Sequence, residues 1–273
     1  MKDPGLHILI WIRAAFRKGF PSLQRTRSTP VFSNRRSKIV FLGFLVETFY
    51  LPLMTVFFCN QFNDFARYVN QFRFTPLEGF DRHDTLYQIG YHGLYLIDVI
   101  LAMGGYAVPV RWLNNKIQSV EPTLLGWSVA LICYPPFNNI GNAYLPYGHR
   151  REWEIIHAPW ALDCLMVLTL LLAALYVGST MMFGTRFSNL THRGILTRGP
   201  YSWIRHPAYI AKNLSWWTEN LPWMGNPMNF LFLAGWNGIY VLRAMTEERH
   251  LRQDPTYQAY CQKVKYRFIP GIY

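Results

Sequence analysis

Long apolar stretches that carry almost no charge alternate with polar segments along most of the chain. A helix of about 20 apolar residues crosses the roughly 30 Å hydrocarbon core of a bilayer. Four stretches have about that length: Ile39–Phe58, Tyr87–Val108, Thr123–Ala143 and Trp160–Met182. Two shorter ones, Pro207–Trp223 and Pro227–Leu242, flank the turn signal Gly225-Asn226-Pro227 and predict a helical hairpin. The pattern predicts an all-α, polytopic membrane protein with about six transmembrane helices.

A few polar or helix-breaking residues interrupt these stretches. Pro135 and Pro136 are expected to break or kink the third one, because proline removes a backbone donor and clashes with the preceding turn. Glu47, Asp98 and Asp163 lie within predicted spans, where ionisable residues usually face the bundle interior or a wet cavity. These three are candidates for a functional role or for pairing inside the bundle, and we leave them outside the predicted site.

The basic residues are unevenly divided between the two predicted sides of the membrane. With the N-terminus inside, 21 of the 27 Lys and Arg residues fall on the inner side and five in the outer loops. The inner segments are 1–38, 109–122, 183–206 and 243–273. Because cytoplasmic loops are enriched in Lys and Arg, both termini are expected in the cytoplasm. The membrane would be a bacterial inner membrane, or the endoplasmic reticulum in a eukaryote.

The composition agrees with this architecture and excludes other classes. Of 273 residues, 51% are hydrophobic and 15% are charged, which excludes a disordered chain and argues against a water-soluble enzyme. The mean hydropathy is only +0.04, so strongly polar segments must accompany the apolar ones. The net charge of +12 is attributed to topology and contact with anionic headgroups, since no nucleic-acid-binding motif is present. Neither the four scattered cysteines nor His149 and His157 have the spacing of a metal site.

The ends of the chain differ from its middle. In the basic segment 1–38, residues Leu6–Phe20 are apolar with interleaved Arg and Lys, which fits an interfacial amphipathic helix. A signal peptide, or a twin-arginine signal at Arg35-Arg36, is the alternative, but we favour a cytoplasmic flank because no small-residue cleavage site follows the apolar run. Residues 39–189 hold the first four predicted helices, and residues 190–273 form a C-terminal region of different character.

Polar residues gather at the predicted inner end of the hairpin. Arg205, His206 and Tyr209 stand at the mouth of a span, and Pro207 suits the first turn of a helix. A helix N-terminus that points at a polar cavity is a favourable position for an anionic group. Helical spacing from Tyr209 then places further polar or aromatic residues on one face: Lys212 or Asn213, Trp216, and Glu219 or Asn220.

The combined spacing of motifs in this region resembles a known family. The motifs are R-G-P-Y-x-x-x-R-H-P-x-Y, the apolar hairpin, E-E-x-x-L at Glu247, and Y-x-x-Y-x-x-x-V-x-Y-R-F-I-P at the end. They resemble the isoprenylcysteine carboxyl methyltransferase family of integral membrane enzymes, which is similar here to the phospholipid N-methyltransferases. The resemblance covers about residues 190–273, and nothing comparable covers residues 1–189.

The resemblance implies a pocket for S-adenosylmethionine at the cytoplasmic end of the hairpin. The cofactor-binding candidates are Arg205, His206, Pro207, Tyr209, Asn213, Glu247, Glu248, Arg267 and Pro270, and the catalytic candidates are Arg205 and Glu248. Glu247 or Glu248 would meet the cofactor's ammonium group or hold Arg205, and Arg267 to Pro270 would close the pocket. Ala211 departs from the family, which usually has glycine there, so its methyl group is expected to narrow the approach of the cofactor.

The leading hypothesis is a methyltransferase that uses S-adenosylmethionine to methylate a lipophilic or membrane-partitioned carboxylate, amine or thiol. The protein would position the two partners, with Arg205 orienting a carboxylate and His206 as a candidate base, by proximity alone. Membrane lipids and a lipophilic or lipidated acceptor are the expected partners. An NADPH-dependent reductase of the sterol type is an alternative, as is a non-catalytic transporter or scaffold, although the spans show no inverted repeat.

Overall fold

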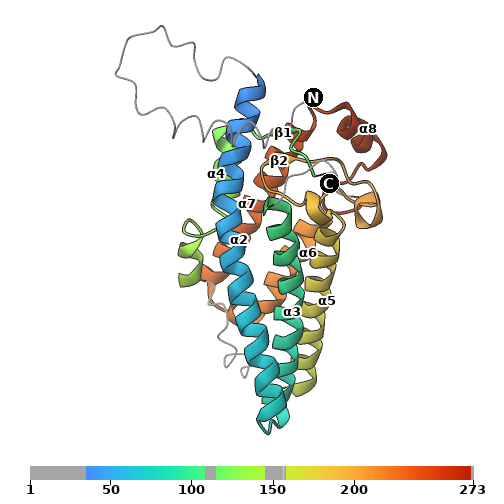
Figure 1. The fold of residues 1–273 in the computed structure, drawn as a ribbon. Helices are drawn as coiled ribbons and strands as arrows, with labels where there is room; N and C mark the ends of the chain where they lie inside the picture. The colour runs from blue at the N-terminus through green and yellow to red at the C-terminus, as the bar shows by residue number, and fades with distance from the viewer. Residues whose placement is uncertain (1–34, 108–114, 145–155, 157, 272–273) are drawn as a thin grey trace, which may run out of the picture.

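A computed structural model describes residues 35–107, 115–144, 156 and 158–271. Three long helices run side by side along the molecule: α2 (Arg35–Phe74), α3 (Gly79–Ala107) and α5 (Pro159–Met181) (Figure 1). Within the described ranges, these three are the helices long and apolar enough to cross a membrane. The predicted all-α class is confirmed. The interfacial helix expected at Leu6–Phe20, and His149 and His157, lie outside the described residues.

The third apolar stretch differs from its prediction. Instead of one spanning helix over Thr123–Ala143, it forms the short helix α4 (Leu124–Leu131) and the 3-10 turn η2 (Asn139–Ala143). Pro135 and Pro136 lie between them, where a helix would need a donor that proline lacks. α4 contacts α7 rather than continuing through the bundle. An eight-residue helix is only about 12 Å long, so this stretch cannot cross a bilayer as a single helix.

The C-terminal hairpin forms as predicted, with unequal arms. α6 (Pro207–Glu219) and α7 (Pro227–Leu251) both begin with proline, and the 3-10 turn η6 (Leu221–Trp223) joins them. The 13 residues of α6 span about 20 Å, which is less than a bilayer core. α7 continues well past the expected end at Leu242 and carries both glutamates of the predicted site on its last turns.

Irregular segments gather at one end of the bundle, together with the last helix (Figure 1). They include η4 (Gly184–Arg186), η5 (Gly199–Ser202), α8 (Pro255–Lys263) and a two-stranded sheet. In this sheet β1 (Ser119–Val120) pairs antiparallel with β2 (Thr191–His192), which ties the segment before α4 to the segment after α5. The described parts of the segments that sequence analysis assigned to the inner side, residues 35–38, 115–122, 183–206 and 243–271, therefore lie towards this end.

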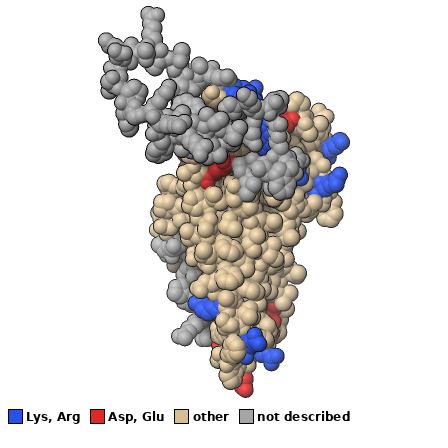
Figure 2. Space-filling model, in the orientation of Figure 1, with Lys and Arg blue, Asp and Glu red and all other residues tan. Residues whose placement is uncertain are grey.

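The outer surface of the helices is apolar around its middle. On the face drawn in Figure 2, Lys, Arg, Asp and Glu gather towards the two ends and leave a wide band of other residues between them. Large hydrophobic side chains such as Phe44, Ile100, Leu171 and Leu231 are exposed along the helices. A soluble monomer rarely exposes so large an apolar surface. This belt and the three apolar helices fit a membrane protein.

The ionisable residues within the predicted spans all have partners. Asp98 is buried on α3 and accepts hydrogen bonds from Tyr176 (2.8 Å) and Thr180 (2.5 Å) on α5. Glu47 lies 3.5 Å from the guanidinium of Arg193. Asp163 lies near the other end of the bundle, 2.8 Å from the exposed His83. Two of the three carboxylates therefore hold helices or loops together inside the protein, as the sequence hypothesis of internal pairing requires.

Two neighbouring glycines of α3 stand in different environments. A Cβ atom on Gly105 would lie 2.7 Å from the Phe187 carbonyl oxygen and 3.1 Å from that of Thr185, which is closer than real contacts allow. A Cβ on Gly104 would meet nothing within 4 Å. Gly105 therefore lets the end of α3 approach the backbone after α5, and its own carbonyl accepts a 2.6 Å hydrogen bond from Arg193.

We expect Gly105→Ala to destabilise the protein by about 1–3 kcal/mol, since the backbone at Phe187 would have to shift. Gly104→Ala is the matched control and should be neutral or stabilising by about 0.5–1 kcal/mol, because alanine favours a helix. Thermal unfolding of both variants in detergent measures the difference. Equal melting temperatures for the two variants would contradict the close approach.

Candidate cofactor site

A cavity of about 140 Å³ opens where the irregular segments meet the ends of α5, α6 and α7. Its lining comes mainly from the end of α5, the loop 183–196, residues 201–212 around the start of α6, and the last turns of α7 with α8, and Tyr134 joins it from the segment after α4. Arg205, His206, Tyr209 and Glu247 are among the lining residues. Four of the nine residues predicted for the cofactor site thus border one cavity.

The C-terminal tail docks on the R-H-P segment through the backbone. The N–H of Arg205 donates to the Tyr266 carbonyl and the N–H of His206 to the Arg267 carbonyl, both at 3.0 Å. Pro207 then occupies the first turn of α6, where its missing donor costs nothing. Two residues far apart in the sequence, Arg205 and Arg267, are consequently held on the same side of α7.

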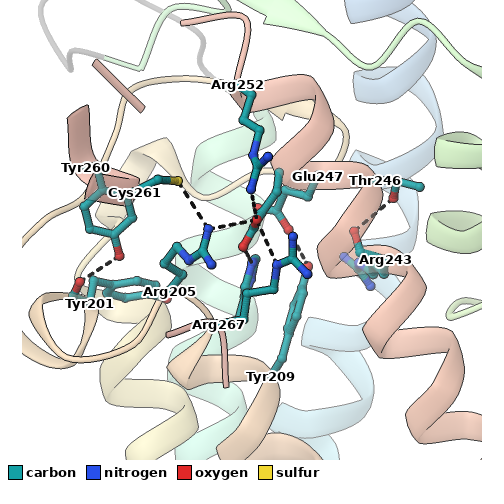
Figure 3. A network of polar contacts seen from close by, with 12 residues as sticks. Tyr201, Arg205, Tyr209, Arg243, Thr246, Glu247, Arg252, Tyr260, Cys261 and Arg267 are labelled. Carbon is teal, nitrogen blue, oxygen red and sulfur yellow. Dashed lines mark hydrogen bonds and ion pairs between the residues drawn. The ribbon is translucent and has the colours of Figure 1, made fainter. Parts of the chain in front are cut away.

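The carboxylate of Glu248 is the centre of the polar network. It accepts hydrogen bonds from Arg205 Nη1 at 3.0 Å and Arg267 Nε at 2.9 Å, and Arg252 Nη2 lies 3.5 Å away. His206 Nε2 is 3.2 Å from its other oxygen. Figure 3 shows the three arginines converging from different directions on this point. Glu248 is 1% exposed, so these groups take the place of water around the carboxylate.

These contacts shift the pKa values of both Glu248 and Arg205. Burial alone raises the pKa of Glu248, but the hydrogen bond and charge of His206, with the arginines, outweigh burial and hold the pKa below 4.5. For Arg205, burial lowers the pKa of the guanidinium, and the charge of Glu248 with the contact to Cys261 more than reverses this effect. The pair is ionised at neutral pH, as the sequence hypothesis of Glu248 holding Arg205 requires.

Glu247 has a different environment from its neighbour. It lines the cavity and accepts a 2.8 Å hydrogen bond from the hydroxyl of Tyr209, whose ring stacks on His206 with 5.3 Å between ring centroids. Successive residues of a helix point in different directions. Glu247 therefore presents a carboxylate to the cavity, whereas the carboxylate of Glu248 is occupied by the protein's own cations.

The remaining predicted residues do not line the cavity. Asn213 donates to the Tyr209 carbonyl at 2.7 Å, and its side-chain oxygen is buried with no partner among the described residues. Pro270 is exposed and Pro207 shapes the helix start. Ala211 is fully buried in a cluster with Tyr176 and Val177, so its methyl group occupies space between α5 and α6.

Several residues of the site escaped the sequence prediction. Arg243, one turn before Glu247, is 8% exposed and lines the cavity, although its position just after the last predicted span suggested a topology charge. The i, i+4 relation to Glu247 was the available signal. Cys261, one of the four scattered cysteines to which the sequence assigned no site, lies 3.3 Å from Arg205. Tyr201 and Tyr257 also line the cavity; both belong to the quoted motifs, but neither was among the predicted site residues.

Glu248→Gln should destabilise the protein by about 3–5 kcal/mol, since it leaves a buried cluster of cations without its carboxylate. The pKa of Glu248 is lowered in the folded state, so its stabilisation is present above pH 4.5 and is lost as pH falls below that value. Melting temperatures measured from pH 7 to pH 3.5 should therefore fall more steeply for the wild type than for the variant.

Glu247→Gln is the matched control for this experiment. Its carboxylate contacts a neutral tyrosine hydroxyl, so the substitution should cost much less stability than Glu248→Gln. If both variants melted at the same temperature, the central role of Glu248 would be refuted.

Comparison with known proteins supplies a family. Residues 158–257 match the family model described as phospholipid methyltransferase. No curated protein and no solved structure matches the chain. The match covers α5, the R-H-P segment, the hairpin and the start of α8, and its first residue lies upstream of the boundary at 190 drawn from the motifs. The resemblance noted in the sequence is thereby confirmed for residues 158–257, which are similar to the membrane methyltransferases of this family.

Proposed function

We propose that this protein transfers a methyl group from S-adenosylmethionine to a lipophilic acceptor at a membrane. The family match implies a methyltransferase. The observation that carries the proposal is the pairing of a cavity-facing carboxylate, Glu247, with a neighbouring carboxylate, Glu248, that is fully engaged by the protein's own cations. Such a site leaves one negative charge available to a cationic ligand.

The cavity residues fit the cofactor's functional groups. S-adenosylmethionine has a sulfonium, an ammonium, a carboxylate and an aromatic base. Glu247 is suited to the ammonium or the sulfonium, and tyrosines such as Tyr209 and Tyr257 offer faces to a base or a cation. Arg205 lines the same cavity, and its Nε has no partner among the described residues, so it can donate to a carboxylate.

The protein's contribution to the reaction is positioning. The cofactor supplies an activated methyl group and its own leaving group, so the residues of the chain need to bind, orient and exclude water. In this proposal Arg205 is the catalytic candidate, because it lines the cavity and would contact a bound ligand. Glu248 is a positioning residue, because it accepts a hydrogen bond from Arg205 and would act only through it. His206 is held by Glu248, and it is the candidate to take a proton if the acceptor is an amine or a thiol.

The surroundings of the cavity suit two ligands of opposite polarity. The irregular segments at one end of the bundle give a soluble cofactor access, and the apolar belt of the helices lets a lipid-like acceptor approach. We propose that this end faces the cytoplasm, which agrees with the excess of Lys and Arg in the segments gathered there. Membrane lipids and lipidated molecules are the proposed partners.

We expect S-adenosylhomocysteine to raise the melting temperature of the detergent-purified full chain. At a ligand concentration 100 times Kd, binding stabilises the folded state by about 2.7 kcal/mol. Glu247→Gln should weaken this binding at least about tenfold, because it removes the carboxylate from the cavity wall. Glu78→Gln, an exposed glutamate near the start of α3, is the control and should bind as the wild type does.

Transfer of a radiolabelled methyl group to native membrane lipids and proteins completes the test, and the labelled fraction identifies the acceptor class. No thermal shift and no labelling would refute the proposed function. Protection by NADPH without any effect of S-adenosylhomocysteine would instead establish a reductase.

A further inference from the structure

The cavity has a strong excess of positive charge. Among the described residues that line it, five are cationic and one, Glu247, is anionic. The cationic residues are Arg186, Arg193, Arg205, Lys212 and Arg243. S-adenosylmethionine itself carries two positive groups and one negative group, so the cofactor alone does not account for so many cations. The charge therefore points to a second, anionic ligand.

Carboxylates of the protein neutralise two of these cations. Arg205 pairs with Glu248 at 3.0 Å, and Arg193 lies 3.5 Å from Glu47. Arg186 is partly exposed at the polar end of the bundle, where water can solvate it. Lys212 and Arg243 are left, and within the described part of the chain neither has a carboxylate within 4 Å.

Arg243 is buried with neutral partners. Its Nη2 donates to the side-chain oxygen of Asn189, and its guanidinium lies 5.5 Å from the ring centroid of Tyr209 and 5.7 Å from those of Tyr134 and Tyr240. Figure 3 shows Arg243 apart from the arginines that converge on Glu248. A guanidinium offers five donors. Its strongest partner would be a carboxylate or a phosphate, and neither comes from its own neighbours.

Lys212 is in a similar position one helix away. Its ammonium lies over the rings of Tyr176 at 4.8 Å and Trp216 at 5.4 Å, and its nearest hydrogen-bond partner is the Tyr176 hydroxyl at 3.5 Å. Asp98 belongs to the same polar cluster, but it accepts from Tyr176 and Thr180 instead. The aromatic rings of Trp216 and Tyr240 contact each other, and each lies beside one of the two cations.

We infer that Lys212 and Arg243 select the acceptor by binding a negatively charged group on it, a phosphate or a carboxylate. This inference rests on the proposed function. Cations within a membrane protein are costly and usually meet an anion or a wet cavity. The arrangement divides the cavity in two, with the cofactor between Glu247 and Arg205, and the acceptor's anion at Lys212 and Arg243, deeper between α6 and α7. Acceptors without a negative charge would bind weakly.

The test uses the full chain in a neutral detergent and three probes. Dioctanoyl phosphatidic acid is the anionic lipid, dioctanoylglycerol is its neutral match, and inorganic phosphate represents a free anion. Binding is followed by native mass spectrometry and by melting temperature. We expect wild-type protein to bind the anionic lipid at least about tenfold more tightly than either other probe, since one charged hydrogen-bonded contact is worth about 1.5–3 kcal/mol.

Lys212→Met should remove most of that preference with little effect on the melting temperature, because within the described ranges no carboxylate forms a salt bridge with Lys212 and its nearest hydrogen-bond partner is 3.5 Å away. Lys212→Arg should restore the preference. Arg243→Met provides a second variant, although it also breaks the contact with Asn189 and should lower the melting temperature. Lys263→Met, an exposed residue of α8, is the control for the loss of one positive charge.

Each contrary result has a separate meaning. If Lys212→Met bound the anionic lipid as the wild type does, or if inorganic phosphate bound as tightly as the lipid, the inference would be overturned. If both Lys212→Met and Arg243→Met lost S-adenosylhomocysteine and lipid together, the two cations would belong to the cofactor, which also overturns it. The failure of the proposed function differs from these results, because wild-type protein would then not bind S-adenosylhomocysteine at all.

Discussion

The buried carboxylate of Glu248 is the interaction on which the C-terminal half of the structure depends. Three segments meet at it: the R-H-P segment through Arg205 and His206, the tail through Arg267, and α7 through Glu248 itself and the C-cap residue Arg252. Bringing these cations together without the carboxylate would place like charges in contact. With the carboxylate present, each arginine forms a directional, charged hydrogen bond to Glu248, and this bond fixes the position of the segment that carries the arginine.

The membrane imposes the second constraint. Backbone groups in hydrocarbon must be paired within the protein, so helices occupy the apolar belt and irregular segments gather at the polar end (Figure 1). There the strand pairing of β1 with β2 is extended by the bonds Gln118 N to His192 O and Glu121 N to Leu190 O, each 2.8 Å. Glu121 in turn accepts from Arg249 on α7 at 3.0 Å. The loops are therefore joined to the helix that carries the site.

Periodicity and motif spacing predicted a large part of this arrangement, and the reasons for the misses are physical. The first, second and fourth apolar stretches form long helices, and a single proline, Pro52, lies within α2 without ending it. In the third stretch, Pro135 and Pro136 stand next to each other and both lack a backbone donor, and the chain there forms α4 and η2 instead of one long helix. The motifs identified Arg205, His206 and both glutamates, because charged residues beside an apolar helix need a partner or a cavity.

What the sequence did not reveal was the division of tasks among like residues. Glu247 and Glu248 are adjacent residues of the same type, but their side chains leave α7 in different directions. The carboxylate of Glu247 therefore lines the cavity, whereas that of Glu248 binds the protein's own arginines. Arg243 looks like a topology charge in a linear count and Lys212 like an isolated cation within a predicted span, because their aromatic neighbours come from distant segments. Spacing can show that charges lie near a helix end, but tertiary packing decides which of them are already neutralised.

That division also fits the proposal that one cavity binds two ligands of opposite charge. A cluster in which every cation faced its own carboxylate would be stable but would bind nothing. A cluster with no internal pairing would have to desolvate several bare charges at once. Here Glu248 and Glu47 neutralise Arg205 and Arg193, whereas Glu247, Lys212 and Arg243 keep charge available at the wall. The paired ions fix the positions of the segments around the cavity. The ions without a salt bridge are the ones proposed to select the ligands by charge.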